Sequence, residues 1–130
     1  MEPAILIFVV EDEEAIAHIL EAELSEGGFD VHVVHSGKEA IAELERDAKR
    51  FRALLTDINL GPGPTGWDVA HRARELCSEM AIVYMTGGNA HEWRAQGVPQ
   101  SVLLQKPFAA AQVIAALTTL LNTSGGNALG

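Results

Sequence analysis

Acidic, hydroxyl and ammonium side chains follow four separate apolar segments of this 130-residue chain. Glu11 and Asp12 follow AILIFVV, Asp57 follows ALLT, Thr86 follows AIVYM, and Lys106 follows VLLQ. Carboxylates gathered in one small cleft repel one another unless a positive charge lies between them. Such a set of groups could hold a hard cation such as Mg²⁺ and the oxygens of a transferred phosphoryl group. Asp57 would then be the nucleophile and would form an aspartyl phosphate.

These side chains can meet only if the apolar segments are strands of one sheet. Strands are predicted over residues 4–10, 31–34, 53–56, 81–85 and 102–104, and helices over 14–26, 37–48, 67–77, 90–96 and 109–121. Ser36 and Glu39 form a capping-box pattern ahead of the second helix. Strands that alternate with helices indicate an α/β fold, a doubly wound parallel sheet with helices on both faces. In such sheets, ligands bind beyond the carboxyl ends of the strands.

The composition is that of one globular domain, which we place at residues 1–121, with a flexible polar tail at 122–130. Hydrophobic residues make up 48% of the chain, yet no apolar run reaches the roughly 20 residues of a membrane helix. The net charge of −9 argues against direct nucleic-acid binding, which depends on clustered Lys and Arg. One cysteine, Cys77, fits a reducing compartment. We interpret Trp93 as a core-packing residue, with an exposed recognition residue as the alternative.

Four motifs in this order resemble the receiver domain of bacterial two-component response regulators. They are VEDE at residues 10–13, LTDINL at 55–60, YMTGG at 84–88 and QKPF at 105–108. The resemblance extends from about Ala4 to Leu121. It implies a flavodoxin-like, five-stranded parallel sheet with strand order 2-1-3-4-5.

The resemblance also implies a magnesium-dependent phosphoacceptor site. Asp57 looks like the phosphoacceptor and would bind Mg²⁺ as well. Asp12 would bind the ion directly, Glu11 mainly through water, and Asn59 through its backbone carbonyl.

The remaining site residues implied by the resemblance would contact the phosphoryl group. The Thr86 hydroxyl and the Lys106 ammonium would hold its oxygens, with help from the Gly87 backbone N–H. The Lys106–Pro107 peptide is often cis in this family.

The function implied is a cytoplasmic switch in a two-component phosphorelay. A histidine kinase or histidine phosphotransfer protein would phosphorylate Asp57, and a downstream protein would bind the face formed by helix 4, strand 5 and helix 5. No membrane contact is expected, a homodimer is compatible with the pattern, and output is expected through protein contact. The alternative is a pseudo-receiver that acts as a constitutive interaction module.

An aspartyl phosphohydrolase is a further alternative. Such enzymes typically need a second carboxylate two residues after the nucleophile, where this chain has Asn59. We therefore expect no enzyme in the usual sense, and slow autodephosphorylation at most.

Three positions depart from the family pattern. Many members carry Tyr or Phe three residues before the lysine, where this chain has Leu103, so the usual coupling of Thr86 to an aromatic ring is not expected. Gly87 stands where Ala is common, and the loop from Gly61 to Gly66 is rich in Gly and Pro.

Overall fold

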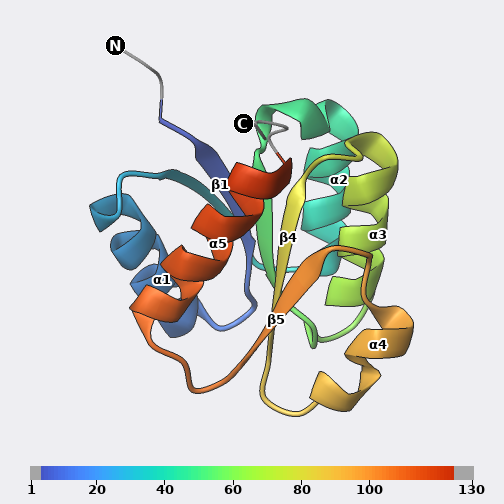
Figure 1. Cartoon of the computed structure of the whole chain (residues 1–130). Coiled ribbons are helices and arrows are strands. Elements are labelled where there is room, and N and C mark those ends of the chain that lie inside the picture. Colours follow the sequence, from blue (N-terminus) through green and yellow to red (C-terminus); the bar gives the residue numbers. More distant parts are fainter. Residues whose placement is uncertain (1–3, 125–130) are drawn as a thin grey trace.

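The computed structural model describes residues 4–124 and contains the predicted parallel sheet (Figure 1). Its strands are β1 (Leu6–Val10), β2 (Asp30–Val34), β3 (Ala53–Asp57), β4 (Ala81–Thr86) and β5 (Ser101–Gln105). The strand order is β2-β1-β3-β4-β5, and every neighbouring pair is parallel. This topology confirms the predicted fold class and strand order.

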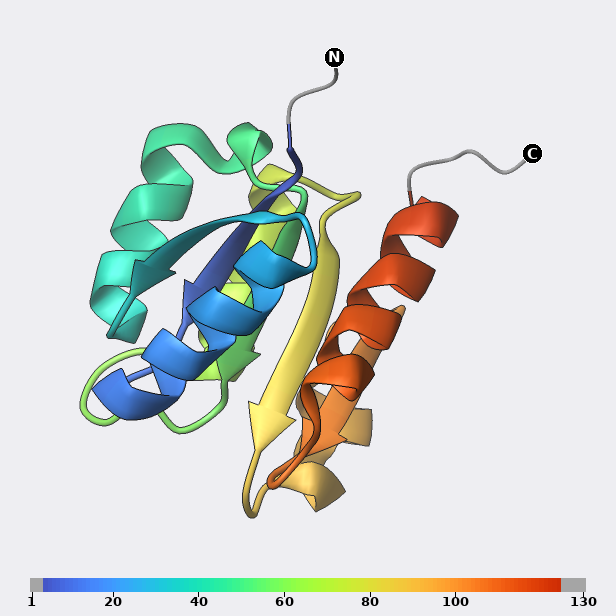
Figure 2. The same cartoon turned by 90° about the vertical axis from the view of Figure 1, so that its left-hand side faces the viewer.

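Helices cover both faces of the sheet. They are α1 (Glu14–Glu26), α2 (Gly37–Asp47), α3 (Gly66–Leu76), α4 (Trp93–Gln96) and α5 (Ala110–Ser124), with short 3₁₀ turns η1 (Ala48–Arg50) and η2 (Ala90–Glu92). Helices α1 and α5 lie on one face, and α2 and α3 lie on the other (Figures 1 and 2). This arrangement places both faces of the central strands in the core.

The alternation of side chains along β1 shows why the strand is apolar throughout. Ile7 and Val9 point to the core under α1 and α5, whereas Phe8 and Val10 point to the core under α2 and α3. All four are fully buried. Burying a side chain of this size contributes roughly 1.5–3 kcal/mol, and β1 carries no polar residue before Glu11 and Asp12 follow it.

Three local features differ from the predictions. Helix α5 ends at Ser124, beyond the predicted Leu121, and residues 125–130 of the predicted tail lie outside the described residues. Ser36 caps α2 as predicted, but Glu39 accepts from the backbone N–H of His35 rather than from that of Ser36.

Trp93 is 37% exposed, so the interpretation of Trp93 as a core residue was wrong. Its indole N–H donates to Ser101 at the surface, because α4 is too short to bury it.

Within residues 4–124, no helix combines the length and the apolar character that a membrane crossing requires.

Candidate functional site

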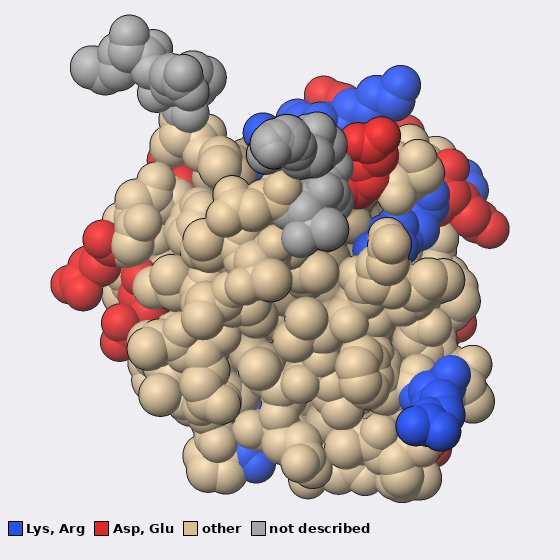
Figure 3. All heavy atoms as spheres, in the orientation of Figure 1, with Lys and Arg blue, Asp and Glu red and all other residues tan. Residues whose placement is uncertain are grey.

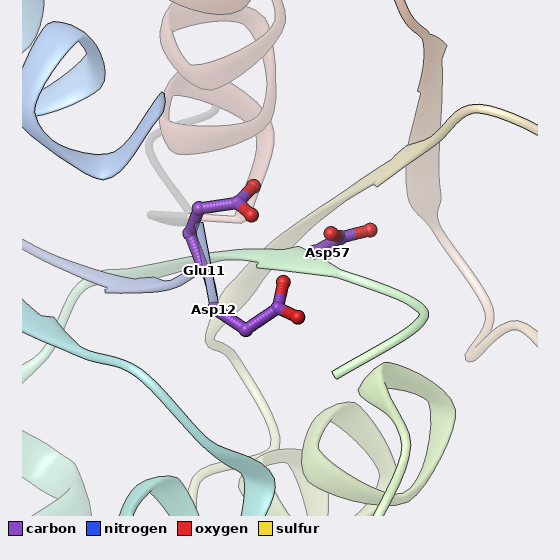
Figure 4. Close-up of side chains that lie close together, drawn as sticks. All are labelled: Glu11, Asp12 and Asp57. Carbon is purple, nitrogen blue, oxygen red and sulfur yellow. The ribbon is translucent and has the colours of Figure 1, made fainter. Parts of the chain in front are cut away.

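Three carboxylates from two adjacent strands meet at the carboxyl edge of the sheet (Figure 4). Glu11 and Asp12 follow β1, and Asp57 ends β3, which is paired with β1. One carboxylate oxygen from each lies within 4.8 Å of the others. Glu11 is fully buried, Asp57 is 7% exposed, and Asp12 is exposed to solvent. This cluster of carboxylates, called the acidic cleft below, is therefore open to solvent on the side of Asp12.

Lys106 brings the compensating positive charge into this cleft. Its ammonium nitrogen lies 3.2 Å from Asp57 Oδ2 and 3.3 Å from Glu11 Oε1. The Lys106 backbone N–H donates to the Thr86 carbonyl at 2.8 Å, which fixes the lysine at the end of β5, and the Lys106–Pro107 peptide is cis. Burial lowers the pKa of Lys106, but the Asp57 and Glu11 carboxylates more than offset this effect, so the pKa is raised. The side chain is thus held as an ammonium.

Glu11 is the most perturbed acid of the cleft. Its Oε2 accepts from the Glu13 backbone N–H at 3.1 Å, and its backbone carbonyl lies 3.0 Å from His35 Nδ1. Burial, helped by the nearby Asp57 charge, raises the pKa of Glu11 to about 7, against the opposing effects of the Glu13 N–H and Lys106. The cleft thus holds a carboxyl group that titrates close to neutral pH.

This raised pKa predicts a pH-dependent stability of the metal-free protein. Because the folded protein binds a proton at Glu11 more tightly than the unfolded chain does, protonation stabilises the fold, and this stabilisation is lost as pH rises toward and through about 7. With EDTA present, the free energy of unfolding in urea should fall by about 1 kcal/mol from pH 6 to pH 8.

Glu11→Gln is the matched control for that measurement, because it keeps the shape of the side chain and removes its titration. Groups elsewhere in the chain titrate in both proteins, so the difference between the two pH profiles isolates Glu11. If the two profiles run parallel over this range, the raised pKa of Glu11 is wrong.

Thr86 ends β4 and is fully buried. Its hydroxyl oxygen accepts from the backbone N–H groups of Gly88 at 3.1 Å and Asn89 at 2.7 Å. Thr86 therefore shapes its own turn, which is the local role that a Thr before Gly-Gly commonly has. A hydroxyl that accepts hydrogen bonds still has its own hydrogen to donate, so this turn is compatible with the predicted contact to a phosphoryl oxygen.

Asn89 connects the turn after β4 to the loop after Asp57, a link that the sequence interpretation missed. The Asn59 side-chain amide donates to Asn89 Oδ1 at 2.6 Å, and the Asn89 backbone N–H donates to the Thr86 hydroxyl oxygen. The only available signal was a polar residue at the same sheet edge, which is common in turns. The Asn59 side chain is thereby fixed, whereas the metal contact of its carbonyl stays a prediction.

The glycine-rich loop after Asp57 folds back onto β3. The Gly66 N–H donates to the Ile58 carbonyl at 2.8 Å, and a Cβ on Gly66 would lie 2.1 Å from the Asp57 carbonyl oxygen. Thr65 and Asp68 form a complete capping box that starts α3 at this point. Glycine is therefore required at Gly66, because the first residue of α3 lies directly against the backbone of Asp57.

The donor set of the cleft fits a divalent cation of the Mg²⁺ type. Such an ion prefers oxygen ligands and keeps several waters, and here Glu11, Asp12 and Asp57 supply carboxylate oxygens, with Asp12 exposed to solvent. The structure thus brings together Glu11, Asp12, Asp57 and Lys106 as predicted. It places Thr86 at the end of β4 and Asn59 in the loop that follows β3.

Comparison with known sequences identifies the family to which the chain is similar. The family model for the response regulator receiver domain matches residues 7–118. The transcriptional regulatory protein TrcR of Mycobacterium tuberculosis is 30% identical over 122 residues, which are 92% of this chain and 46% of TrcR. The chain spans about half the length of the curated relatives it matches.

Comparison with solved structures agrees. A response regulator receiver protein from Sinorhizobium medicae is 41% identical, with a TM-score of 0.90 over 93% of this chain and 97% of that one. The receiver domain of the sensor histidine kinase PA1611 from Pseudomonas aeruginosa is 25% identical, with a TM-score of 0.79 over 92% of this chain and 99% of that domain. That structure has a magnesium ion coordinated in its active-site cleft.

Proposed function

The chain belongs to the response regulator receiver family, and from this premise we propose that it is a phosphoacceptor switch that receives a phosphoryl group on Asp57. The observation that carries the proposal is the position of the Lys106 ammonium, which lies between Asp57 and Glu11 at 3.2 and 3.3 Å. A half-buried lysine that contacts the acceptor carboxylate and Glu11 leaves the exposed side, where Asp12 lies, to a cation and a phosphoryl donor.

The transfer reaction uses Asp57 as the nucleophile. One carboxylate oxygen attacks the phosphorus of the donor's phosphohistidine, so an O–P bond forms while the N–P bond breaks and the imidazole leaves with the electron pair. The Lys106 ammonium, 3.2 Å from Asp57 Oδ2, supplies a positive charge directly beside the attacking carboxylate. Lys106 and the Thr86 hydroxyl then hold oxygens of the new phosphoryl group, with the Gly87 N–H assisting.

A Mg²⁺ ion bound by Asp12, Asp57, the Asn59 carbonyl and, through water, Glu11 would supply the charge that neutralises the phosphoryl oxygens during transfer. The chain's own residues orient the acceptor. Asp57 is held by Lys106 on one side and by its own strand on the other. Three carboxylates lie close together here and Lys106 supplies one positive charge, so a bound cation would reduce the repulsion that remains.

The phosphoryl donor is proposed to be a histidine kinase or a histidine phosphotransfer protein. The output partner is proposed to be a protein that binds the α4–β5–α5 face, which is largely free of charged side chains (Figure 3). Helix α5 has no Asp, Glu, Lys or Arg between Ala110 and Ser124. An uncharged face suits a protein partner, or a second copy of this chain, better than nucleic acid.

Turnover is proposed to be slow, so the protein acts as a switch rather than as a phosphatase. The position two residues after Asp57 is Asn59, whose amide is bonded to Asn89 and cannot act as a general acid or base. The single cysteine, Cys77, is a free thiol, which agrees with a cytoplasmic location.

Beryllofluoride tests the proposal, because it binds aspartyl carboxylates as a mimic of the phosphoryl group. Trp67 is 7% exposed and directly follows Gly66, which contacts the Asp57 backbone. In a Trp93→Phe variant, in which Trp67 is the remaining tryptophan, beryllofluoride with Mg²⁺ should change the Trp67 emission. The same variant without Mg²⁺ is the control.

An unchanged emission, together with an unchanged protein mass after incubation with acetyl phosphate and Mg²⁺, would contradict phosphoacceptance. Failure to bind Mg²⁺ at millimolar concentration would instead favour the constitutive interaction module.

A further inference from the structure

Tyr84 of β4 links two segments that are far apart in the sequence. Its side chain is fully buried, and its ring lies 4.7 Å from that of Trp67, the second residue of α3. Its hydroxyl oxygen accepts the backbone N–H of Val98 at 3.0 Å. Tyr84 therefore connects the start of α3 with the segment between α4 and β5.

The start of α3 is itself coupled to Asp57 by direct contact. Gly66 touches the Asp57 backbone so closely that a methyl group there would lie 2.1 Å from the Asp57 carbonyl oxygen. Trp67 comes next in the chain and is buried against Tyr84. Because packed interiors have little free volume, a shift of the Asp57 backbone must displace Gly66 and the Trp67 ring with it.

On the other side, Val98 belongs to a segment that is tied to α4. Ser101 Oγ donates to the Val98 carbonyl at 2.7 Å and accepts from the Trp93 indole N–H at 2.9 Å. The Gly97 N–H donates to the Trp93 carbonyl and closes the last turn of α4. A change in the position of the Val98 amide would therefore alter the hydrogen bonds that hold α4.

Leu103 of β5 lies beside Tyr84, at the position where many receivers carry an aromatic residue. It pairs with Tyr84 across β4 and β5 and packs on the same core face. An aliphatic residue has no hydroxyl that could contact the α4 segment, whereas Tyr84 already makes such a contact from the neighbouring strand.

We propose that Tyr84 couples the phosphorylation state of Asp57 to α4 through its hydroxyl contact with Val98. The pathway runs from Asp57 through Gly66 and Trp67 to Tyr84, and the Tyr84–Val98 hydrogen bond is the element that differs between the two states. This inference rests on the proposed function, because it requires a phosphoryl group or its mimic on Asp57. Tyr84 is a positioning residue: it touches neither the donor nor the phosphoryl group.

The test uses the full chain and the variant Tyr84→Phe, which keeps the ring against Trp67 and removes the hydroxyl. Beryllofluoride binding is measured by ¹⁹F NMR, and the motion of α4 by hydrogen exchange of the Gly97 amide, which does not contact Tyr84. In the wild type, beryllofluoride with Mg²⁺ should change the Gly97 exchange rate by about fivefold or more, within the usual range of coupling between sites. In Tyr84→Phe, beryllofluoride should still bind while this change is lost.

His71→Ala is the matched control, since it removes a hydrogen bond to the Gln96 carbonyl at the end of α4 but lies outside the pathway. It should alter the basal exchange rate and keep the response to beryllofluoride. Trp67→Phe breaks the pathway on the side of Asp57 and should weaken the response, which provides a second variant if Tyr84→Phe does not fold.

A Tyr84→Phe protein that binds beryllofluoride and shows the wild-type response overturns the inference and leaves the proposed function intact. A wild type that binds beryllofluoride without any change at Gly97 also overturns it. If the wild type does not bind beryllofluoride, the proposed function fails and the inference fails with it.

Discussion

Asp57→Asn should abolish covalent phosphorylation by acetyl phosphate with Mg²⁺, measured as the loss of the mass increase on the intact protein. An amide does not attack phosphorus as a carboxylate does, and the other acids of the cleft are not equivalent acceptors. Glu11 is fully buried and takes up a proton near neutral pH, and Asp12 lies on the exposed side without the contact to Lys106. The expected effect is a loss of the product to below detection.

Asp47→Asn is the control for the change in net charge. Asp47 is exposed at the end of α2, away from the cleft, and its replacement should leave the phosphorylation rate unchanged. The Asp57→Asn protein should also show a lower pKa for Glu11, because the Asp57 charge is one of the causes that raise it. A normal mass increase in Asp57→Asn would mean that another side chain accepts the phosphoryl group.

The sequence was sufficient to predict the sheet and the main polar groups of the cleft. Continuous apolar runs identify strands that are buried on both faces, and the carboxyl ends of parallel strands lie at one edge. The sequence therefore predicts that Glu11, Asp57 and Lys106 lie at one edge of the sheet, and in the structure Lys106 contacts both acids. The position of a charged residue directly after a strand can be read from the sequence, and it is enough to predict which residues share this edge of the sheet.

Contacts between turns could not be predicted in the same way. Asn89 bonds to Asn59 across two loops, and this depends on how each turn is oriented above the sheet. Glu39 accepts from the His35 N–H rather than from that of Ser36, a difference of one residue that depends on the backbone path after β2. Such contacts depend on how separate turns are arranged in space, and local sequence patterns carry little information about that arrangement.

For the aromatic residues Trp93 and Tyr84 as well, the sequence alone does not predict the surroundings of the side chain. A Trp in a short helix and a Tyr in an apolar strand both read as core residues. The short α4 leaves Trp93 at the surface, whereas the Tyr84 hydroxyl finds a backbone partner in Val98. Hydrophobicity alone does not distinguish these outcomes, because each depends on how much of a neighbouring element is present to cover the ring.

Gly66→Ala should destabilise the protein by about 2–3 kcal/mol, because the added methyl group cannot be accommodated. The new Cβ would lie 2.1 Å from the Asp57 carbonyl oxygen and 2.7 Å from the Ile58 Cα, and both are backbone atoms that cannot rotate away. In an exposed helix, the same replacement would stabilise the helix, since Ala has the higher helix propensity. Urea unfolding measures the difference, which corresponds to a fall in melting temperature of roughly 10 °C.

Gly87→Ala is the matched control, because it makes the same chemical change in the same cleft. A Cβ on Gly87 would meet no described atom within 4 Å, and its backbone does not lie in the left-handed region. The free energy of unfolding should therefore change by less than about 0.5 kcal/mol or rise slightly, as restriction of the unfolded chain predicts. Equal stabilities of Gly66→Ala and Gly87→Ala would show that α3 does not lie against Asp57, and the route from Asp57 through Trp67 to Tyr84 would lose its first step.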